Sequence, residues 1–340
     1  MRAIVHDRNG SSTVLRLVDR PVPEPAAGEV VVAIRVSGVN PTDWKTRAGK
    51  SRTMTTGVEH TPNQDGAGVI SAVGSGVDPA RIGQRVWVYQ AAWQRPAGGT
   101  AKEYLALPAD QAVPLPDEAG YDLGAALGIP AMTAHRCLTV AEGGPTTLRP
   151  GALAGRTVLV SGGAGAVGHA AIGLARWAGA RVIATVSGRA KAELAEAAGA
   201  HHVVRYTEPG CADRIRELAP DGIDQFVEVA PGVNVELDVA VARQAATVAF
   251  YASDAVGSLP IWAGMTKNLR WQAVLIYTVP TAALHDAARD VTAAVADGAL
   301  RVGAEAGLPL HRFGLEDTAA AHDAVEAGAV GKVLIDVRPA

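Results

Sequence analysis

The chain has 340 residues, of which 48% are apolar and 19% charged, and its formal net charge is -3. This length favours two domains of ordinary globular composition, and the charge does not favour binding to nucleic acid or to an anionic membrane surface. No uncharged apolar run of about eighteen residues predicts a membrane span, no signal h-region opens the sequence, and Cys137 and Cys211 form no CxxC pair, so we expect a cytoplasmic protein without a disulfide framework.

Residues 1–125 are predicted to be rich in β-structure. Short β-branched segments bounded by Gly and Pro are typical of strands, and their spacing favours a small barrel or sandwich. The expected strands are 29–37, 69–73, 85–89, 101–107 and 112–114.

From Leu123 onward, strands and helices alternate, which predicts a parallel, doubly wound sheet. The expected strands are 157–161, 181–186, 202–205, 223–229, 246–252 and 274–278, and the expected helices are 166–178, 190–198, 211–218, 234–243 and 281–296. A helix is also expected over 125–139, started or kinked by Pro130. A final strand over 332–337 returns to the first domain, so we predict domains of 1–125, completed by 298–340, and 126–297.

A glycine-rich turn joins the predicted strand 157–161 to the helix that follows it. The turn reads Gly163, Ala164, Gly165, Ala166, Val167 and Gly168. Glycines permit a tight turn and let the backbone approach a pyrophosphate, and the start of a helix offers free N–H groups. The pattern therefore predicts a dinucleotide site, although a tight turn that binds nothing gives the same pattern.

The strand 181–186 ends without the acidic residue that usually binds the ribose hydroxyls of NAD. Ser187, Arg189 and Lys191 stand there instead. A hydroxyl and two cations suit a 2′-phosphate, so we predict NADPH as the cofactor. The alternative is that both cations are solvated charges at a helix start.

Four segments together resemble the zinc-free quinone oxidoreductase and zeta-crystallin branch of the medium-chain dehydrogenase/reductase superfamily. They are Gly38–Asp43, Thr61–Ile70, Leu127–Ala134 and Gly162–Gly168. The resemblance covers nearly the whole chain. It implies an α/β fold in which a β-rich, chaperonin-10-like (GroES-like) catalytic domain is split around a Rossmann domain, with the active site in the cleft between them and a homodimer that joins along residues 246–278.

The zinc-dependent relatives carry cysteine in the first of these segments and His-Glu in the second. This chain has Asp43 and Gln64-Asp65 at those places. Zinc prefers thiolate or imidazole ligands in a closed tetrahedral set. We therefore expect no metal, and hydride transfer to an acceptor that is already activated.

The resemblance implies three catalytic candidates. Asn40 and Thr133 match an asparagine and a threonine beside the nicotinamide, and His60 stands where relatives often carry tyrosine. Each has a structural alternative: turn chemistry at Asn-Pro, a helix threonine bonded to its own backbone, and a histidine in a solvent-facing loop.

Further residues are expected to line the substrate and cofactor sites. Trp44 and Lys45 alter the substrate wall, Trp44 being able to stack on a flat quinone or to anchor a core, and Trp93 and Tyr277 complete the substrate set. The remaining cofactor candidates lie at strand ends, which line the ligand crevice of such sheets. They are Tyr206, Ala230, Tyr251, Ile276 and Thr278.

The leading functional hypothesis is an NADPH-dependent quinone oxidoreductase that acts on a small molecule. A reductase of enoyl or 2-alkenal substrates uses the same fold and hydride but needs a positioned acid for the enolate carbon. A third possibility is a non-catalytic protein that binds NADPH or RNA, and the acidic balance of charge disfavours RNA.

Overall fold

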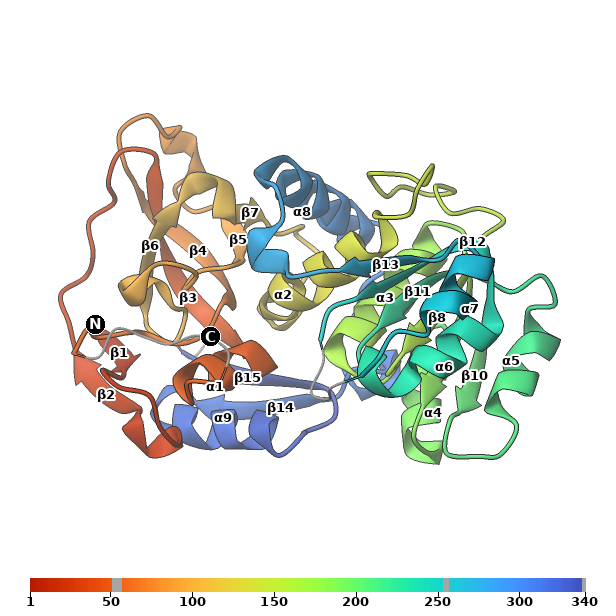
Figure 1. Ribbon diagram of the computed structural model, residues 1–340. Helices are drawn as coiled ribbons and strands as arrows, with labels where there is room; N and C mark the ends of the chain where they lie inside the picture. Colours follow the sequence, from red (N-terminus) through yellow and green to blue (C-terminus); the bar gives the residue numbers. More distant parts are fainter. Residues whose placement is uncertain (51–56, 253–256, 338–340) are drawn as a thin grey trace. The chain divides into compact units, whose positions relative to one another are not determined.

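The computed structural model describes residues 1–50, 57–252 and 257–337, and these residues form two units (Figure 1). The first unit comprises Met1–Ile129 and the C-terminal segment from Leu310, and the second comprises Pro130–Pro309. The sequence placed the boundaries at 125/126 and 297/298. Helix α2 (Tyr121–Leu138) crosses the first of these positions without a break, and His169 bonds the carbonyl of Ala306 at 2.8 Å, within the second unit.

The first unit is built on a seven-stranded sheet. Its hydrogen-bonded order is β14-β15-β3-β4-β5-β7, and β6 also pairs with β3. The strands are β3 (Glu29–Val39), β4 (Asp65–Val73), β5 (Arg85–Val88), β6 (Tyr104–Pro108), β7 (Ala112–Pro114), β14 (Leu310–Gly314) and β15 (Lys332–Asp336). β1 (Arg2–Val5) and β2 (Arg16–Asp19) form a separate antiparallel pair.

Strand β3 is the centre of this sheet. It is rich in valine, which favours extended backbone and packs well on a pleated surface. β3 pairs antiparallel with β4, β6 and β15, and Val30, Val32 and Ile34 lie fully buried in the core. The C-terminal β15 therefore does return to the first unit, as the sequence predicts.

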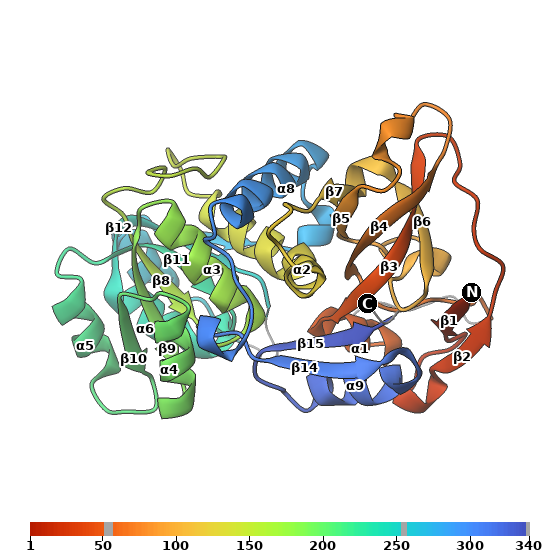
Figure 2. The same cartoon turned by 180° about the vertical axis from the view of Figure 1, so that it is seen from behind.

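The helices of the first unit are short. They are α1 (Pro41–Arg47) and α9 (Thr318–Glu326), with 3-10 turns at Ser12–Val14, Pro79–Arg81, Pro96–Gly98, Ala109–Gln111 and Leu315–Asp317. α9 connects the parallel strands β14 and β15 and lies beside them in Figure 2.

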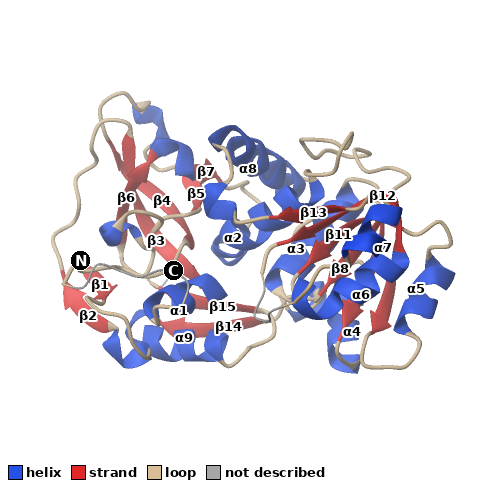
Figure 3. Ribbon diagram, viewed as in Figure 1, coloured by secondary structure: helices blue, strands red, loops and turns tan. Residues whose placement is uncertain are grey.

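The second unit contains a six-stranded parallel sheet in the order β10-β9-β8-β11-β12-β13, with helices between successive strands (Figure 3). This is the doubly wound order in which the chain reverses direction beside the first strand, the place where such sheets bind dinucleotides. The strands are β8 (Thr157–Ser161), β9 (Arg181–Val186), β10 (His202–Arg205), β11 (Ile223–Glu228), β12 (Ala242–Phe250) and β13 (Arg270–Ala273).

The helices of the second unit follow the sequence prediction closely, except that residues 261–266 form a helix that was not predicted. They are α3 (Ala166–Trp177), α4 (Arg189–Ala197), α5 (Cys211–Leu218), α6 (Pro231–Val241), α7 (Ile261–Thr266) and α8 (Thr281–Ala296), with 3-10 turns at Ile276–Thr278 and Ala304–Ala306. Pro130 lies inside α2 rather than at its start. Within the described ranges, no helix has the length and apolarity that a membrane crossing requires; a cytoplasmic location stays a prediction.

The strand predicted over 274–278 is wrong. The last strand of the sheet is β13, and residues 276–278 form a 3-10 turn. β13 is an edge strand, and Arg270, Gln272 and Ala273 are exposed, so it lacks the apolar pattern by which strands are recognised.

Candidate functional site

The glycine turn lies between β8 and α3 in the second unit. A Cβ on Gly168 would lie 2.3 Å from the carbonyl oxygen of Gly162, so only glycine allows α3 to start this close to the strand. A Cβ on Gly165 would meet nothing nearer than 3.4 Å, which leaves open space beside this residue. The first N–H groups of α3 have no partner within the helix. A pyrophosphate could therefore approach the backbone at Gly165 and bind these groups.

The groups predicted to hold a 2′-phosphate follow β9. Ser187 comes directly after the strand, and Arg189 is the first residue of α4. Arg189 pairs with Glu193 at 3.2 Å through a side chain that is 86% exposed. Lys191 has no ion-pair partner in the described part of the chain, and Tyr206 follows β10 with an exposed ring. The ends of adjacent parallel strands thus bring a hydroxyl, two cations and a phenol to one edge of the sheet.

Glu228, at the end of β11, and Asp238 form a buried carboxyl cluster that the sequence did not predict. Glu228 accepts hydrogen bonds from the N–H of Ala230 and from Asn234 Nδ2, the latter at 2.9 Å. Burial raises the pKa of Glu228 and raises that of the neighbouring Asp238 strongly. The N–H of Tyr251 donates to the carbonyl of Glu228 at 3.1 Å. Since its own N–H is already bonded, Ala230 has no free backbone donor for a ribose.

The other candidates of the second unit lie on α2 and after β13. Thr133 is buried on α2, and Tyr277 is half-buried in the 3-10 turn between Ile276 and Thr278. Thr278 bonds its own turn, from Oγ1 to the carbonyl of Leu275 at 3.1 Å. Their roles stay predictions.

Asn40 occupies a buried polar cluster in the first unit. Its Nδ2 donates to Asp65 Oδ2 at 2.7 Å, and its Oδ1 accepts from Lys332 Nζ at 2.7 Å. Its backbone N–H donates to Asp43 Oδ2 at 2.7 Å, where α1 begins. The amide plane is therefore fixed by two side-chain hydrogen bonds inside a buried cluster.

Asp65 is bonded on both oxygens. Oδ2 accepts from Asn40 and lies 3.5 Å from Lys332 Nζ, and Oδ1 accepts from the N–H of Ile129 at 2.9 Å. A Cβ on Gly128 would lie 2.2 Å from Oδ1, so this glycine lets α2 approach the carboxylate.

The charge of this cluster is close to balanced. Burial raises the pKa of Asp65 and lowers that of Lys332, and the charge of each partner opposes the shift. Burial and the charge of Asp65 raise the pKa of Asp43 to about 8. Asp43 thus holds a proton at neutral pH, beside the buried Asp65–Lys332 ion pair.

His60 lies next to His6, the residue after β1. It forms an isolated bridge with His6, with backbone bonds of 2.9 and 2.7 Å and ring centroids 6.0 Å apart. Trp44, on α1, is half-buried, and the ammonium groups of Lys50 and Lys45 lie 4.7 and 5.8 Å from its ring centroid.

Trp93 is half-buried in the turn after β5 and donates its N–H to the carbonyl of Gln90 at 3.1 Å. The structure groups Asn40 with Asp43, Asp65 and Lys332, and it does not bring the other first-unit candidates into that cluster.

The described residues contain no group of three histidine, cysteine, aspartate or glutamate side chains that could hold a metal ion. Asp65 is the obvious oxygen ligand at the place of the zinc motif, and its lone pairs are directed at Asn40, Lys332 and Ile129. The donor set at this place does not suit zinc.

Fold and site together define a two-domain oxidoreductase that works with a nicotinamide dinucleotide. Two family models match: "Alcohol dehydrogenase GroES-like domain" over residues 26–117 and "Zinc-binding dehydrogenase" over residues 166–293. The quinone oxidoreductase of Lama guanicoe is 32% identical over 98% of this chain and 97% of its own.

Solved structures agree with this assignment. A structure of an NAD-dependent alcohol dehydrogenase has a TM-score of 0.85 and 27% identity, covering 99% of this chain and all of that one. A mycobacterial protein in complex with NADPH has a TM-score of 0.80 and 26% identity, covering 98% of this chain and 99% of that one. The chain belongs to the quinone oxidoreductase branch of the medium-chain dehydrogenase/reductase superfamily, which confirms the family and the α/β fold predicted from the sequence.

Proposed function

We propose that the chain is an NADPH-dependent quinone reductase that needs no zinc. The observation that carries this proposal is the Asn40–Asp65–Lys332 cluster, which presents an oriented amide where a zinc site would need free ligands. The full-length similarity to a quinone oxidoreductase supports the choice of acceptor.

NADPH is favoured over NADH by the residues after β9. An acidic residue would repel a 2′-phosphate, and the positions that follow the strand carry Ser187, Arg189 and Lys191 instead. The NADPH complex of the mycobacterial relative agrees with this choice. The bound nicotinamide would supply the hydride, and the protein would supply position.

Asn40 is the proposed positioning group for the acceptor. Its amide is held by Lys332 and Asp65, so an acceptor oxygen that reached its second Nδ2 hydrogen would be bound without a loss of side-chain freedom. A quinone oxygen gains negative charge as hydride arrives, and a fixed N–H dipole stabilises that charge. No step of the reaction is assigned to the remaining candidate residues of the two units, which are His60, Thr133, Trp44, Lys45, Trp93 and Tyr277.

One observation favours reduction of an α,β-unsaturated carbonyl as the second candidate. Asp43 lies beside Asn40 and holds a proton at neutral pH, since its pKa is raised to about 8. An enolate carbon must be protonated after hydride transfer, and a buried neutral acid next to the positioning amide is a source of that proton.

The test is NADPH oxidation against 9,10-phenanthrenequinone, 1,4-benzoquinone, 2-cyclohexenone and 2-hexenal, with NADH as the matched cofactor. Turnover of the quinones alone supports the proposal. Turnover of the enones, lost in Asp43→Asn, supports the second candidate. Tight NADPH binding without turnover of any acceptor would contradict both candidate activities and favour a non-catalytic NADPH-binding protein. Salt-sensitive retention of RNA would then favour a role in RNA binding.

Metal dependence is tested in the same assay. We expect EDTA and 1,10-phenanthroline to leave turnover unchanged, because Asp65 has its oxygens bonded within the protein. Loss of activity that zinc restores would contradict the proposal.

We also propose a homodimer that joins through the edge of the second unit's sheet. β13 is the edge strand, and the start of α6, α7 and the residues that flank α7 and β13 expose large apolar side chains, which mark interaction surfaces when they lie together. These are Val233, Leu259, Ile261, Trp262, Met265 and Leu275, with Trp262 75% exposed. Light scattering of the unmodified protein should give twice the monomer mass. The double variant Trp262→Glu with Met265→Lys should give the monomer mass. Val22→Glu, at an exposed site of the first unit, is the control.

A further inference from the structure

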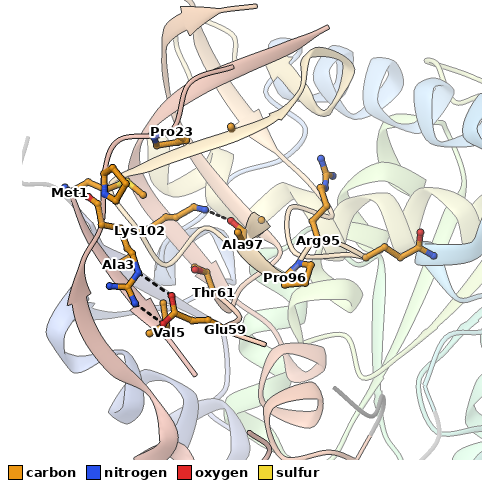
Figure 4. Close-up of a pocket in the computed structure, with 15 residues that line it drawn as sticks. Met1, Ala3, Val5, Pro23, Glu59, Thr61, Arg95, Pro96, Ala97 and Lys102 are labelled. Carbon is orange, nitrogen blue, oxygen red and sulfur yellow. Dashed lines mark hydrogen bonds and ion pairs between the residues drawn. The ribbon is translucent and has the colours of Figure 1, made fainter. Parts of the chain in front are cut away.

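A pocket of about 540 Å³ lies in the first unit, among β1, the segment after β2 and the 3-10 turn Pro96–Gly98 (Figure 4). It is separate from the Asn40 cluster, none of whose residues lines it. Its walls are mostly apolar and include Met1, Val5, Pro21, Pro23, Pro96 and Ala106. A concave, mostly apolar space of this size with a few polar groups is typical of a small-molecule site.

Two cations besides Arg20 line this pocket: Arg95, whose guanidinium donates to the side chain of Gln111, and Lys102, which is more deeply buried. Lys102 is 5% exposed, and its Nζ donates to the carbonyl oxygen of Ala97. No other acceptor and no carboxylate partner of Lys102 occurs among the residues that the structure describes. A buried ammonium has three N–H groups to satisfy and a charge that costs free energy without a counter-ion.

The acidic group of the same pocket cannot serve as that counter-ion. Glu59 is held by Arg20 through two bonds, from Nε to Oε1 at 3.0 Å and from Nη2 to Oε2 at 2.6 Å. This ion pair neutralises both side chains. Lys102 thus remains an unpaired cation, and burial lowers its pKa to about 8.

The backbone around Lys102 is held in place. Lys102 forms an isolated antiparallel bridge with Ala3 of β1, and the N–H of Ile4 donates to the carbonyl of Ala101 at 2.9 Å. Thr61 also lines the pocket, and its hydroxyl has no hydrogen-bond partner in the described ranges. The pocket wall therefore offers a ligand two donors, the charged ammonium of Lys102 and the neutral hydroxyl of Thr61.

We propose that this pocket binds a small aromatic or aliphatic monocarboxylate, whose carboxylate pairs with Lys102 and whose apolar body lies against the prolines and Met1. A neutral ligand would leave the ammonium of Lys102 unpaired. The site is independent of the proposed reductase activity, because it shares no residue with the Asn40 cluster or with the glycine turn.

The test uses calorimetric titration with 2-naphthoate and with its neutral analogue 2-naphthamide at pH 7, in saturating NADP⁺ to occupy the dinucleotide site. We expect naphthoate to bind at least about tenfold more tightly than naphthamide, as a charge-assisted hydrogen bond implies. Lys102→Met should weaken naphthoate about tenfold or more. Arg8→Met, which removes an exposed cation of the same unit, should leave binding unchanged.

A second variant covers the case in which Lys102→Met does not fold. Ala106→Leu keeps Lys102 and fills part of the pocket, so it should abolish the rise in melting temperature that naphthoate gives the unmodified protein. The proposal is overturned if naphthoate and naphthamide bind equally, if Lys102→Met or Ala106→Leu binds naphthoate like the unmodified protein, or if millimolar naphthoate gives neither heat nor a shift.

Discussion

Lys332, near the C-terminus, donates a 2.7 Å hydrogen bond to the side chain of Asn40, which lies 292 positions earlier in the sequence. Both side chains are buried. The bond joins the start of α1 to β15 and fixes the amide that we propose as the positioning group.

Removal of Lys332 should destabilise the protein strongly. Lys332→Met leaves Asp65 buried without its cation, and breaking a buried pair in this way costs about 3–5 kcal/mol. Urea unfolding followed by circular dichroism measures the loss. Lys50→Met removes an exposed lysine of the same unit and should change the free energy of unfolding by less than about 0.5 kcal/mol; similar losses in both variants would contradict the buried pair.

Substitution of two glycines in the same turn should affect stability in one case and NADPH binding in the other. Gly168→Ala places a Cβ 2.3 Å from a backbone oxygen, so it should lower the free energy of unfolding by about 1–3 kcal/mol. Gly165→Ala has room for its Cβ and should fold normally, but the methyl group stands where a pyrophosphate would approach. Thermal unfolding and the KM for NADPH, measured for both variants, separate the two effects. A stable Gly165→Ala enzyme with an unchanged KM for NADPH would contradict the assignment of the pyrophosphate to this turn.

The cations after β9 should select the cofactor. Arg189→Ala combined with Lys191→Ala should raise the KM for NADPH about 10- to 100-fold and leave that for NADH nearly unchanged, because charge-assisted bonds to a phosphate are lost. Arg214→Ala, an exposed arginine on α5 of the same unit, is the matched control. Equal changes with both cofactors would refute the assignment of the 2′-phosphate.

Asp43 should make stability fall as pH rises. Its folded-state pKa is about 8 and an aspartate in an unfolded chain titrates near 4, so the folded protein holds one more proton between these values. The contribution is present in full below about pH 4 and is lost toward pH 8, with a slope approaching about 1.4 kcal/mol per pH unit.

Asp43→Asn keeps the shape of the side chain and cannot titrate. Its free energy of unfolding, measured in urea from pH 5 to pH 8, should lack this contribution to the slope. Parallel curves for the two proteins would show that Asp43 is ionised in the folded state at neutral pH.

The second unit was the easier part to predict. Its strands are buried, β-branched runs, and its helices carry apolar positions at helical spacing, so β8, β9, β10, α5 and α8 agree with the sequence to the residue. The edge strand β13 was not predicted because three of its four residues are exposed and only Trp271 packs against the core. β1, β2, β14, α1, α7 and α9 are short and were not predicted, since local pattern is weak in segments of four to nine residues.

The candidate site shows the same limit of local reasoning. Asn40 was found because it lies in a recognisable motif. Its partner Lys332 belongs to a strand that reads as an ordinary sheet segment, and only the antiparallel pairing of β15 with β3 brings the two residues together. The Glu228–Asp238 cluster was missed for a related reason: these carboxyls stand out only because they are buried, and the sequence does not show that Asp238 is buried while its neighbour Glu236 in the same helix is not.

The pairing of β15 with β3 also sets an order for assembly during synthesis. A ribosome completes Pro130–Pro309 before it reaches β14 and β15, so the second unit can fold while the first still lacks two strands and the cation of Asp65. A nascent chain that ends before Lys332 leaves one edge of β3 open to foreign strands and a carboxylate without its counter-ion. Termination of translation shortly before Lys332 would therefore yield a chain whose second unit folds and whose first unit is incomplete and prone to aggregate. Only a chain that contains β15 can complete its first unit.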